Sequence, residues 1–436
     1  MTNLLAFLCV FVSSRHSFKT LFLPLLLLVT SSIQAQDLDF TRRMIDSLCS
    51  PALQGRGYVN GGDKKAADFL VKQLRTTNAE PIENSYYQYF NIDINTFPGK
   101  VQLGFDQTVL LAGTDFMIGS SSPSIDGSYK ALWLTKESFK KPADFAAFAK
   151  KNLKSTILIL DTGFIETDIQ QLYSAKAIIF AQSTRPTFDV SDGRDVMPYA
   201  SAYVSREKIP QGCKKVSFEV ESLYQKDYQT QNVVAVIKGT QHPDSFLVYT
   251  AHYDHLGRMG AETYFPGAHD NASGCAMLLD LANYYSLPEN QPEYSVAFLF
   301  FSAEEVGLLG SKYFTEHPLI PLSNIKFLLN LDMVSTGSEG IKVVNGAVLK
   351  DQFELLSAVN KQDSLLKTVS PRGEAPNSDH YWFYKKGVPS FFIYTLGPEW
   401  KEYHTPDDIP TGLPMTEYED LFKLATKFME QLTIDN

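Results

Sequence analysis

Five potential metal ligands, two histidines and three carboxylates, are spread over five short motifs of this chain. Two imidazoles and three carboxylates suit a pair of zinc ions that share one bridging carboxylate. Each of the five follows, or lies near the end of, an apolar run that is typical of a strand. We therefore expect a two-metal hydrolase site, and its candidate ligands are His252, Asp270, Glu305, Asp332 and His404.

The first motif, AHYDHLG, places His252 and Asp254 two residues apart, directly after an apolar run. His252 can bind a metal through one ring nitrogen, while a carboxylate such as Asp254 accepts the proton of the other nitrogen and fixes the tautomer. The alternative is an ordinary polar turn. His255 is one step further into a glycine-containing loop, which makes it the weaker candidate ligand.

The second motif, GAHDNASG, places Asp270 just before the start of a predicted helix. Free backbone amides at a helix start favour an anion, and we expect Asp270 to be the bridging carboxylate. The alternative is that Asp270 and Asn271 only cap the helix. His269 is predicted to line the pocket rather than to bind metal.

Two adjacent glutamates, Glu304 and Glu305, follow the deeply apolar run SVAFLFFSA. Two carboxylates at the end of a buried strand are costly unless they bind something. Neighbours on an extended chain point in opposite directions, so one glutamate can face a metal while the other faces the substrate water. We assign Glu305 to the metal and Glu304 to proton transfer; spacing alone also permits the opposite assignment.

The last two candidates are weaker when each is taken alone. Asp332 ends the apolar run FLLNLDM, where a lone aspartate can also be a helix cap or a buried, hydrogen-bonded acid. His404 in YHTPDD can equally be a surface histidine, although Pro406 and the acidic pair after it form a turn that could present the ring inward. Both gain weight because the ligand set is incomplete without them.

From about residue 229 onward, apolar strands alternate with amphipathic helices, which favours an α/β fold with a mixed, mainly parallel sheet covered on both faces. In such sheets ligands lie beyond the carboxyl ends of the strands. His252, the two glutamates and Asp332 all fall at such ends. We expect a catalytic domain made of residues 36–86 and 229–436.

Residues 87–228 differ from the rest of the chain. Short β-like runs such as VQLGF and STILILD are separated by clusters of serine, aspartate and proline, and the segment has no histidine although the chain has eight. This pattern predicts an inserted β-rich domain without catalytic chemistry.

The first 35 residues are predicted to be a signal peptide. An apolar stretch at Leu21–Val29 precedes small residues, and Ala35 suits the last position before cleavage. The stretch is short for a membrane span. We therefore expect a periplasmic or secreted protein without stable membrane insertion after cleavage.

Net charge and cysteine content limit the possible partners and disulfides. The formal net charge is −10, so we expect no nucleic-acid partner. Beyond the signal peptide, Cys49, Cys213 and Cys275 are odd in number, which leaves at least one thiol unpaired. We expect Cys275 to be a buried small residue, and the sequence leaves a Cys49–Cys213 disulfide open.

The five motifs, in this order, resemble those of the M28 family of zinc peptidases, the co-catalytic aminopeptidase type. The pattern H-x-D, D-N-x-S-G, E-E, N-L-D-M and H-T-x-x-D runs from His252 to Asp408. The segment NSDHYWFYKKGVP resembles the family's substrate side, and LQGRG with AADFLVKQL resembles the start of its catalytic domain. The middle segment resembles the protease-associated domain that some members carry as an insertion.

This resemblance implies two zinc ions per chain. The implied ligands of one ion are His252, Asp270 and Asp332, and those of the other are Asp270, Glu305 and His404. Glu304 would be the general base and acid, with Asp254 behind the first histidine. The Asp270–Asn271 peptide bond is often cis in this family.

The expected function is hydrolysis of N-terminal peptide bonds, with a peptide as substrate. A glutaminyl cyclase-like enzyme with one zinc is disfavoured because both extra ligand positions are filled. A carboxypeptidase or a hydrolase of a non-peptide amide stays open, because the groups that bind chain termini are not identified. An intact Glu304 argues against a binding protein that has lost catalysis. Trp382, Phe383 and Tyr394 are candidate pocket walls, with the core as their more common place.

Overall fold

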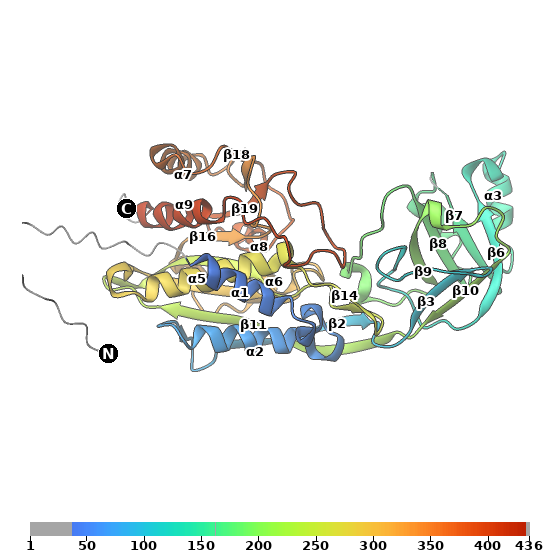
Figure 1. Ribbon diagram of the computed structural model, residues 1–436, viewed down its shortest axis with the longest axis horizontal. Coiled ribbons are helices and arrows are strands. Elements are labelled where there is room, and N and C mark those ends of the chain that lie inside the picture. Colours follow the sequence, from blue (N-terminus) through green and yellow to red (C-terminus); the bar gives the residue numbers. More distant parts are fainter. Residues whose placement is uncertain (1–36, 162, 433–436) are drawn as a thin grey trace, which may run out of the picture. The chain divides into compact units, whose positions relative to one another are not determined.

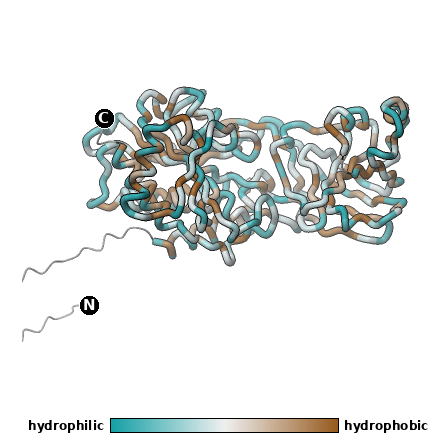
Figure 2. The backbone as a smooth tube through the Cα atoms, turned by 90° about the horizontal axis from the view of Figure 1, so that it is seen from above, coloured by the Kyte–Doolittle hydropathy of each residue, from teal (hydrophilic) through white to brown (hydrophobic). Residues whose placement is uncertain are grey.

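The computed structural model describes residues 37–161 and 163–432, so the predicted signal peptide lies outside the described residues. The described chain builds one nine-stranded and one eight-stranded sheet, together with a two-stranded ribbon of β13 (Arg258–Met259) and β14 (Thr263–Tyr264) (Figure 1). Apolar stretches of the chain occur in the parts that carry each large sheet (Figure 2). A buried core lies against each sheet, and the core of the eight-stranded sheet also includes Phe90 and Ile92 from the nine-stranded sheet.

The nine-stranded sheet is mixed. Its four central strands run parallel in the order β15–β12–β16–β19, and antiparallel neighbours β11 and β17 flank them. The strands are β1 (Glu80–Pro81), β2 (Tyr87–Thr96), β11 (Leu223–Ile237), β12 (His242–His252), β15 (Tyr294–Phe301), β16 (Ile325–Leu331), β17 (Gly340–Val344), β18 (Val369–Arg372) and β19 (Ser390–Leu396). The predicted mixed sheet with a parallel centre is confirmed.

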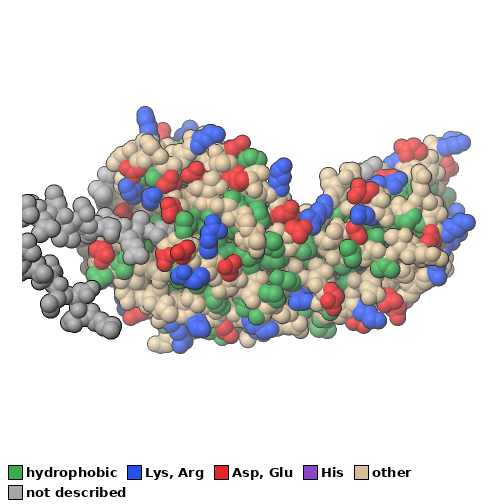
Figure 3. All heavy atoms as spheres, viewed as in Figure 1, with side chains coloured by type: hydrophobic (Ala, Val, Ile, Leu, Met, Phe, Trp, Pro, Cys, Tyr) green, Lys and Arg blue, Asp and Glu red, His purple; other side chains and the backbone are tan. Residues whose placement is uncertain are grey.

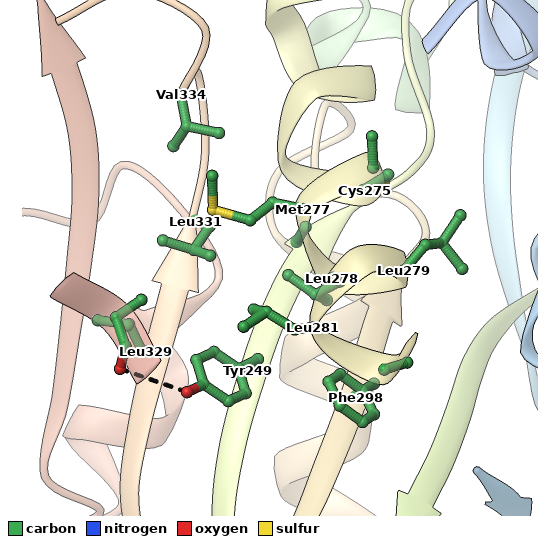
Figure 4. Close-up of a cluster of buried hydrophobic side chains, with 14 of the residues drawn as sticks. Tyr249, Cys275, Met277, Leu278, Leu279, Leu281, Phe298, Leu329, Leu331 and Val334 are labelled. Carbon is green, nitrogen blue, oxygen red and sulfur yellow. Dashed lines mark hydrogen bonds between the residues drawn. The ribbon is translucent and has the colours of Figure 1, made fainter. Parts of the chain in front are cut away.

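Helices cover both faces of this sheet, because its strands bury side chains on both sides. On β12, Tyr249 packs into one core cluster and Val248 into another. The first cluster lies under α1 (Leu38–Leu48), α2 (Gly62–Leu74), α5 (Ser273–Ser286), α7 (Lys350–Asp363) and α9 (Tyr418–Gln431), and the second lies under α6 (Leu309–Glu316) and α8 (His380–Lys385). Figure 4 shows Met277, Leu278 and Leu281 of α5 beside sheet residues. Burial on both faces explains the unbroken apolar runs in the sequence.

The eight-stranded sheet is built by residues 97–222, which lie between β2 and β11 and which we call the insert. Its strands are β3 (Val101–Phe105), β4 (Thr108–Val109), β5 (Phe116–Ile118), β6 (Ser128–Leu134), β7 (Thr156–Leu160), β8 (Ala177–Gln182), β9 (Ala200–Ser205) and β10 (Lys215–Val220). β6 to β9 are parallel, with α3 (Pro142–Ala149) and α4 (Glu166–Gln170) in the connections. The sequence indicated strands here but missed these short helices.

The ends of the predicted inserted domain, residues 87 and 228, fall within β2 and β11. These strands pair with each other, and β11 also pairs with β15 in the nine-stranded sheet. The division into domains, and the resemblance to a protease-associated domain, therefore stay predictions.

Two further expectations concern cysteines and membranes. Cys49, Cys213 and Cys275 are all free thiols, and Cys275 is fully buried with its Sγ 3.1 Å from the His252 carbonyl oxygen. Among the described helices, none combines the length and apolarity that a bilayer span requires. Lys, Arg, Asp and Glu side chains are interspersed on the face shown in Figure 3.

Candidate metal centre

One pocket of about 240 Å³ collects all the predicted ligands. It lies where β12, β15 and β16 end, because the carboxyl ends of parallel strands meet at the same edge of a sheet. Its acidic and imidazole lining consists of His252, Asp270, Glu304, Glu305, Asp332 and His404. Its other walls are Met333, Asn377, Phe392, Tyr394 and Tyr403.

Asp270 lies between the two histidines. Its Oδ1 is 3.2 Å from His252 Nε2, and its Oδ2 is 3.3 Å from His404 Nε2. A second carboxylate approaches each histidine: Asp332 Oδ1 is 3.3 Å from His252 Nε2, and Glu305 Oε2 is 3.2 Å from His404 Nε2. The side chains therefore form two groups that share one carboxylate.

The donor set fits divalent metal ions. Ligand atoms of His252, Glu304 and Asp332 lie within 4.8 Å of one another, as do those of His252, Asp270 and Glu305. No lysine or arginine is among the described residues that line the pocket. Four carboxylates and two imidazoles line the pocket, so even protonated histidines leave carboxylates that need protons or a metal to balance them. Imidazole nitrogens and carboxylate oxygens at this spacing are ligands that zinc accepts.

Electrostatics of the protein alone reflect the crowding. Burial would lower the pKa of His404, but the Glu305 and Asp270 carboxylates raise it to about 11. Burial would raise the pKa of Glu305, but His404 and His255 hold it at about 2. These two side chains thus balance each other in the absence of a metal.

His252 is oriented by the backbone rather than by the side chain that we predicted. Its Nδ1 lies 3.1 Å from the Asp254 carbonyl oxygen and 3.9 Å from the Asp254 Oδ1. The Asp254 carboxylate instead accepts hydrogen bonds from the Glu304 N–H and the Tyr58 hydroxyl, both at 3.1 Å. Burial raises the pKa of Asp254 to about 7. Asp254 therefore connects the His252 and Glu304 loops.

Asp332 follows the last residue of β16 and is held by a chain of buried polar groups. Ser378 Oγ donates to Asp332 Oδ2 at 2.7 Å, and Asn330 Nδ2 donates to Ser378 Oγ at 2.7 Å. Thr250 Oγ1 donates to Asn330 Oδ1 at 2.6 Å. Ser378 was not singled out in the sequence, although it lies in the NSDHYWFYKKGVP segment.

The two glutamates occupy a turn, which corrects the sequence argument about an extended chain. β15 ends at Phe301, and Ala303 has a φ of 57°, so the strand does not continue. The N–H groups of residues 307 and 308 donate to the Glu304 carbonyl, both at 2.8 Å. Glu305 receives a 2.7 Å contact from His255 Nδ1, so His255 supports a predicted ligand and does not join the pocket lining described above.

Asp270 lies in a short turn that opens α5, and its peptide bond to Asn271 is cis, as the resemblance implied. The Asp408 carboxylate accepts the N–H groups of His269 and Asp270. The His269 ring contacts Ser335 Oγ at 2.7 Å and is not among the described pocket-lining residues, contrary to our expectation.

Arg56 is a positioning residue that the sequence did not reveal. It belongs to LQGRG, predicted as a loop, which forms the short 3-10 helix η1 (Pro51–Arg56). Its guanidinium is fully buried and donates to backbone carbonyls around both ligand loops, including Tyr253 at 2.8 Å and Gly267 at 2.9 Å. It also donates to the Asp270 carbonyl at 3.2 Å. A buried arginine has no distinctive sequence pattern, because arginine is usually exposed.

Of the three aromatic residues predicted as candidate pocket walls, one lines the pocket and two do not. Tyr394 lines the pocket. Phe383 is fully buried in the core under α8, and Trp382 is not among the described pocket-lining residues.

Comparison with known proteins agrees with this site. Residues 232–429, which carry all five motifs, match the peptidase family M28 model. Aminopeptidase YwaD of Bacillus subtilis (strain 168) is 33% identical over 196 residues, which are 41% of this chain and 39% of that protein. The match thus spans about two fifths of the length of that curated relative.

Solved structures show the same fold. BSAP, a zinc aminopeptidase from Bacillus subtilis, superposes with a TM-score of 0.69 at 20% identity, covering 90% of this chain and 94% of that one. An aminopeptidase from Aneurinibacillus sp. strain AM-1 gives a TM-score of 0.63 at 20% identity, covering 92% and 94%. The five motifs meet in one pocket and the family model matches across them, so residues 232–429 are the part of this chain that matches peptidase family M28.

Proposed function

We propose that this protein is a zinc-dependent aminopeptidase that removes N-terminal residues from peptides. The observation that carries the proposal is the position of Asp270, with one oxygen toward His252 and the other toward His404. A bridging carboxylate between two histidines is the arrangement that a two-ion site needs. The names of relatives support the activity: YwaD is an aminopeptidase, and a 36% identical relative over 115 residues, from Pyricularia oryzae, is a probable zinc metalloprotease.

The ligands divide into two sets. His252, Asp332 and Asp270 would hold one ion, and Asp270, Glu305 and His404 would hold the other. When bound, such ions supply a water of lowered pKa and a Lewis acid for the peptide carbonyl. Ser378, His255 and the Asp254 carbonyl orient the ligands through the hydrogen bonds described above.

Glu304 is the proposed proton carrier. With Asp270 completing the His252 and Asp332 set, Glu304 is free to face the substrate from the pocket wall. In the protein alone, burial raises the pKa of Glu304 well above its ordinary value. Glu304 takes a proton from the attacking water as oxygen bonds to the peptide carbon, and it delivers that proton to the amine as the C–N bond breaks.

The remaining pocket walls favour an apolar side chain at the N-terminus of the substrate. Met333, Phe392, Tyr394 and Tyr403 provide aromatic and thioether surface around the acidic lining. Apolar walls stabilise a substrate side chain by burying it away from water. We therefore expect leucine, methionine or phenylalanine to be released faster than aspartate or glycine.

Mass-spectrometric product analysis of a mixed peptide pool tests the proposal, with N-terminally blocked peptides in the same tube. Stepwise loss of N-terminal residues from free-amine peptides alone is the expected result. Cleavage from the other end, or only loss of ammonia from N-terminal glutamine, would show a different activity of the same fold. Glu304→Gln should lower kcat by at least about 10²-fold while keeping the metal content, and the exposed Glu289→Gln is its matched control.

A further inference from the structure

His404 lies further from regular structure than the other predicted ligands. Residues 397–417, between β19 and α9, contain no helix or strand. His404 itself has a φ of 54°, in the left-handed region that a non-glycine residue adopts only where its surroundings hold it. We call residues 400–408 the His404 loop, and its support must come from contacts with other parts of the chain.

The insert supplies a backbone contact to the ligand residue itself. The Phe188 N–H donates to the His404 carbonyl oxygen at 3.0 Å. Phe188 is only 2% exposed, and its ring stacks on Phe265 with the centroids 5.0 Å apart. The donor is therefore fixed by a buried aromatic pair, and it can hold the backbone of His404 in place.

Arg185 of the insert contacts the His404 loop on both sides of the ligand. Its Nη1 lies 3.2 Å from Glu402 Oε2, and its Nη2 lies 2.5 Å from Asp407 Oδ2. Glu402 Oε2 also accepts a hydrogen bond from Thr405 Oγ1 at 2.7 Å. One guanidinium thus connects the residues that precede and follow His404, and a planar fork suits such paired recognition.

A third contact comes from the turn before β5. Gly113 has a φ of 81°, and a Cβ at this position would lie 2.8 Å from Pro406 Cγ. The insert therefore packs against the His404 loop closely enough that a side chain at Gly113 would displace it.

We propose that Arg185 and Phe188 are positioning residues for His404, and that the insert thereby sets the affinity for the ion that His404 and Glu305 would hold. The inference rests on the proposed two-ion centre. Neither insert residue contacts His252 or Asp332 through a described hydrogen bond or ion pair. The effect should therefore be confined to one of the two ions.

The inference is tested by comparing the zinc affinity of the Arg185→Ala variant with that of the wild type. The purified full-length protein is equilibrated against a series of buffered free zinc concentrations, and bound zinc is measured by mass spectrometry. We expect one of two binding steps to weaken by about tenfold or more, with the other unchanged. Arg185→Lys, which keeps the charge, should restore part of the loss.

Arg206→Ala is the matched control. Arg206 is also in the insert, its side chain is 40% exposed against 37% for Arg185, and it pairs with Asp161 at 3.3 Å. This variant should bind zinc as the wild type does. Equal weakening of both steps in Arg185→Ala, or unchanged affinities, would overturn the inference.

Hydrogen–deuterium exchange of the metal-free protein separates this inference from the proposed function. Peptides that cover residues 397–409 should exchange faster in Arg185→Ala and not in Arg206→Ala. Unchanged exchange would show that Arg185 does not hold the loop. If the wild type binds fewer than two zinc ions, the two-ion proposal fails, and the exchange result still decides whether the insert holds the loop.

Discussion

The two sides of the candidate metal centre are built in different ways. On one side, His252 ends β12 and Asp332 follows β16, and these neighbouring strands are joined by parallel backbone pairing. On the other side, Glu305 lies in a turn and His404 lies in an irregular loop. The side chain of His252 is 2% exposed and that of His404 is 10% exposed. The strand side owes its geometry to regular structure, and the loop side owes it to contacts between distant segments.

Two arginines illustrate the difference. Arg56 is fully buried and binds backbone carbonyls behind His252 and Asp270. Arg185 is partly exposed and binds two carboxylates beside His404. A buried cation that satisfies carbonyls contributes to global stability, whereas exposed ion pairs contribute little to it and can still fix a local geometry.

Asp270 belongs to both sides, so its substitution should have the largest effect. Asp270→Asn removes the negative charge that both histidines face, and we expect loss of zinc from both proposed sites and of detectable activity. His404→Ala should lose one ion only. Zinc content after gel filtration distinguishes the variants, and an Asp270→Asn protein that keeps one tightly bound ion would show that the carboxylate is not shared.

Arg56→Met should have the largest effect on folding. It leaves several buried carbonyls without a donor, and we expect the free energy of unfolding to fall by about 3 kcal/mol or more. Urea denaturation of the metal-free protein measures this, with the exposed Arg75→Met as the control. Arg185→Ala should lower stability by no more than about 1 kcal/mol. Similar losses for Arg56→Met and Arg185→Ala would remove the contrast between the two sides.

Ser378→Ala should weaken the strand side alone. Loss of the 2.7 Å hydrogen bond to Asp332 Oδ2 frees this carboxylate to rotate, and we expect about tenfold weaker binding of one zinc ion. Competition with a zinc chelator measures the affinity. Ser295→Ala, at the start of β15, is a buried control away from the pocket. If the double variant with Arg185→Ala loses only one ion's affinity, both residues act on the same side.

Glu399→Gln should have the smallest effect and should depend on pH. The Glu399 carboxylate accepts the N–H groups of Gly337 and Ser338 at 3.0 Å and so fixes the start of the loop side. Burial would raise the pKa of Glu399, but hydrogen bonds from the hydroxyl and the N–H of Ser338 lower it to about 2. Its contribution, about 1 kcal/mol after solvent screening, is therefore present above the unfolded pKa and is lost as pH falls toward 2. Urea denaturation at pH 7 and pH 3 should show the difference between wild type and variant shrinking at the lower pH.

The sequence predicts the strand side well because the residues that mark each strand and its ligand are neighbours in the chain. Apolar runs mark the strands, and polar residues directly after them mark the edge where His252 and Asp332 meet. The role of Arg56 was not predicted because it depends on the burial of a charged side chain, which the spacing of apolar residues in the sequence does not indicate. Arg185 contacts residues 217 and 222 positions away in the chain, so no local pattern could connect it with His404.

Anomalous diffraction at the zinc edge, from crystals of the zinc-loaded protein, tests the two-ion centre most directly. We expect two peaks in the pocket, one beside His252 and Asp332 and one beside Glu305 and His404, with Asp270 contacting both. A single fully occupied peak at saturating zinc, with Asp270 or His404 turned away from it, would contradict the two-ion centre and the mechanism drawn from it.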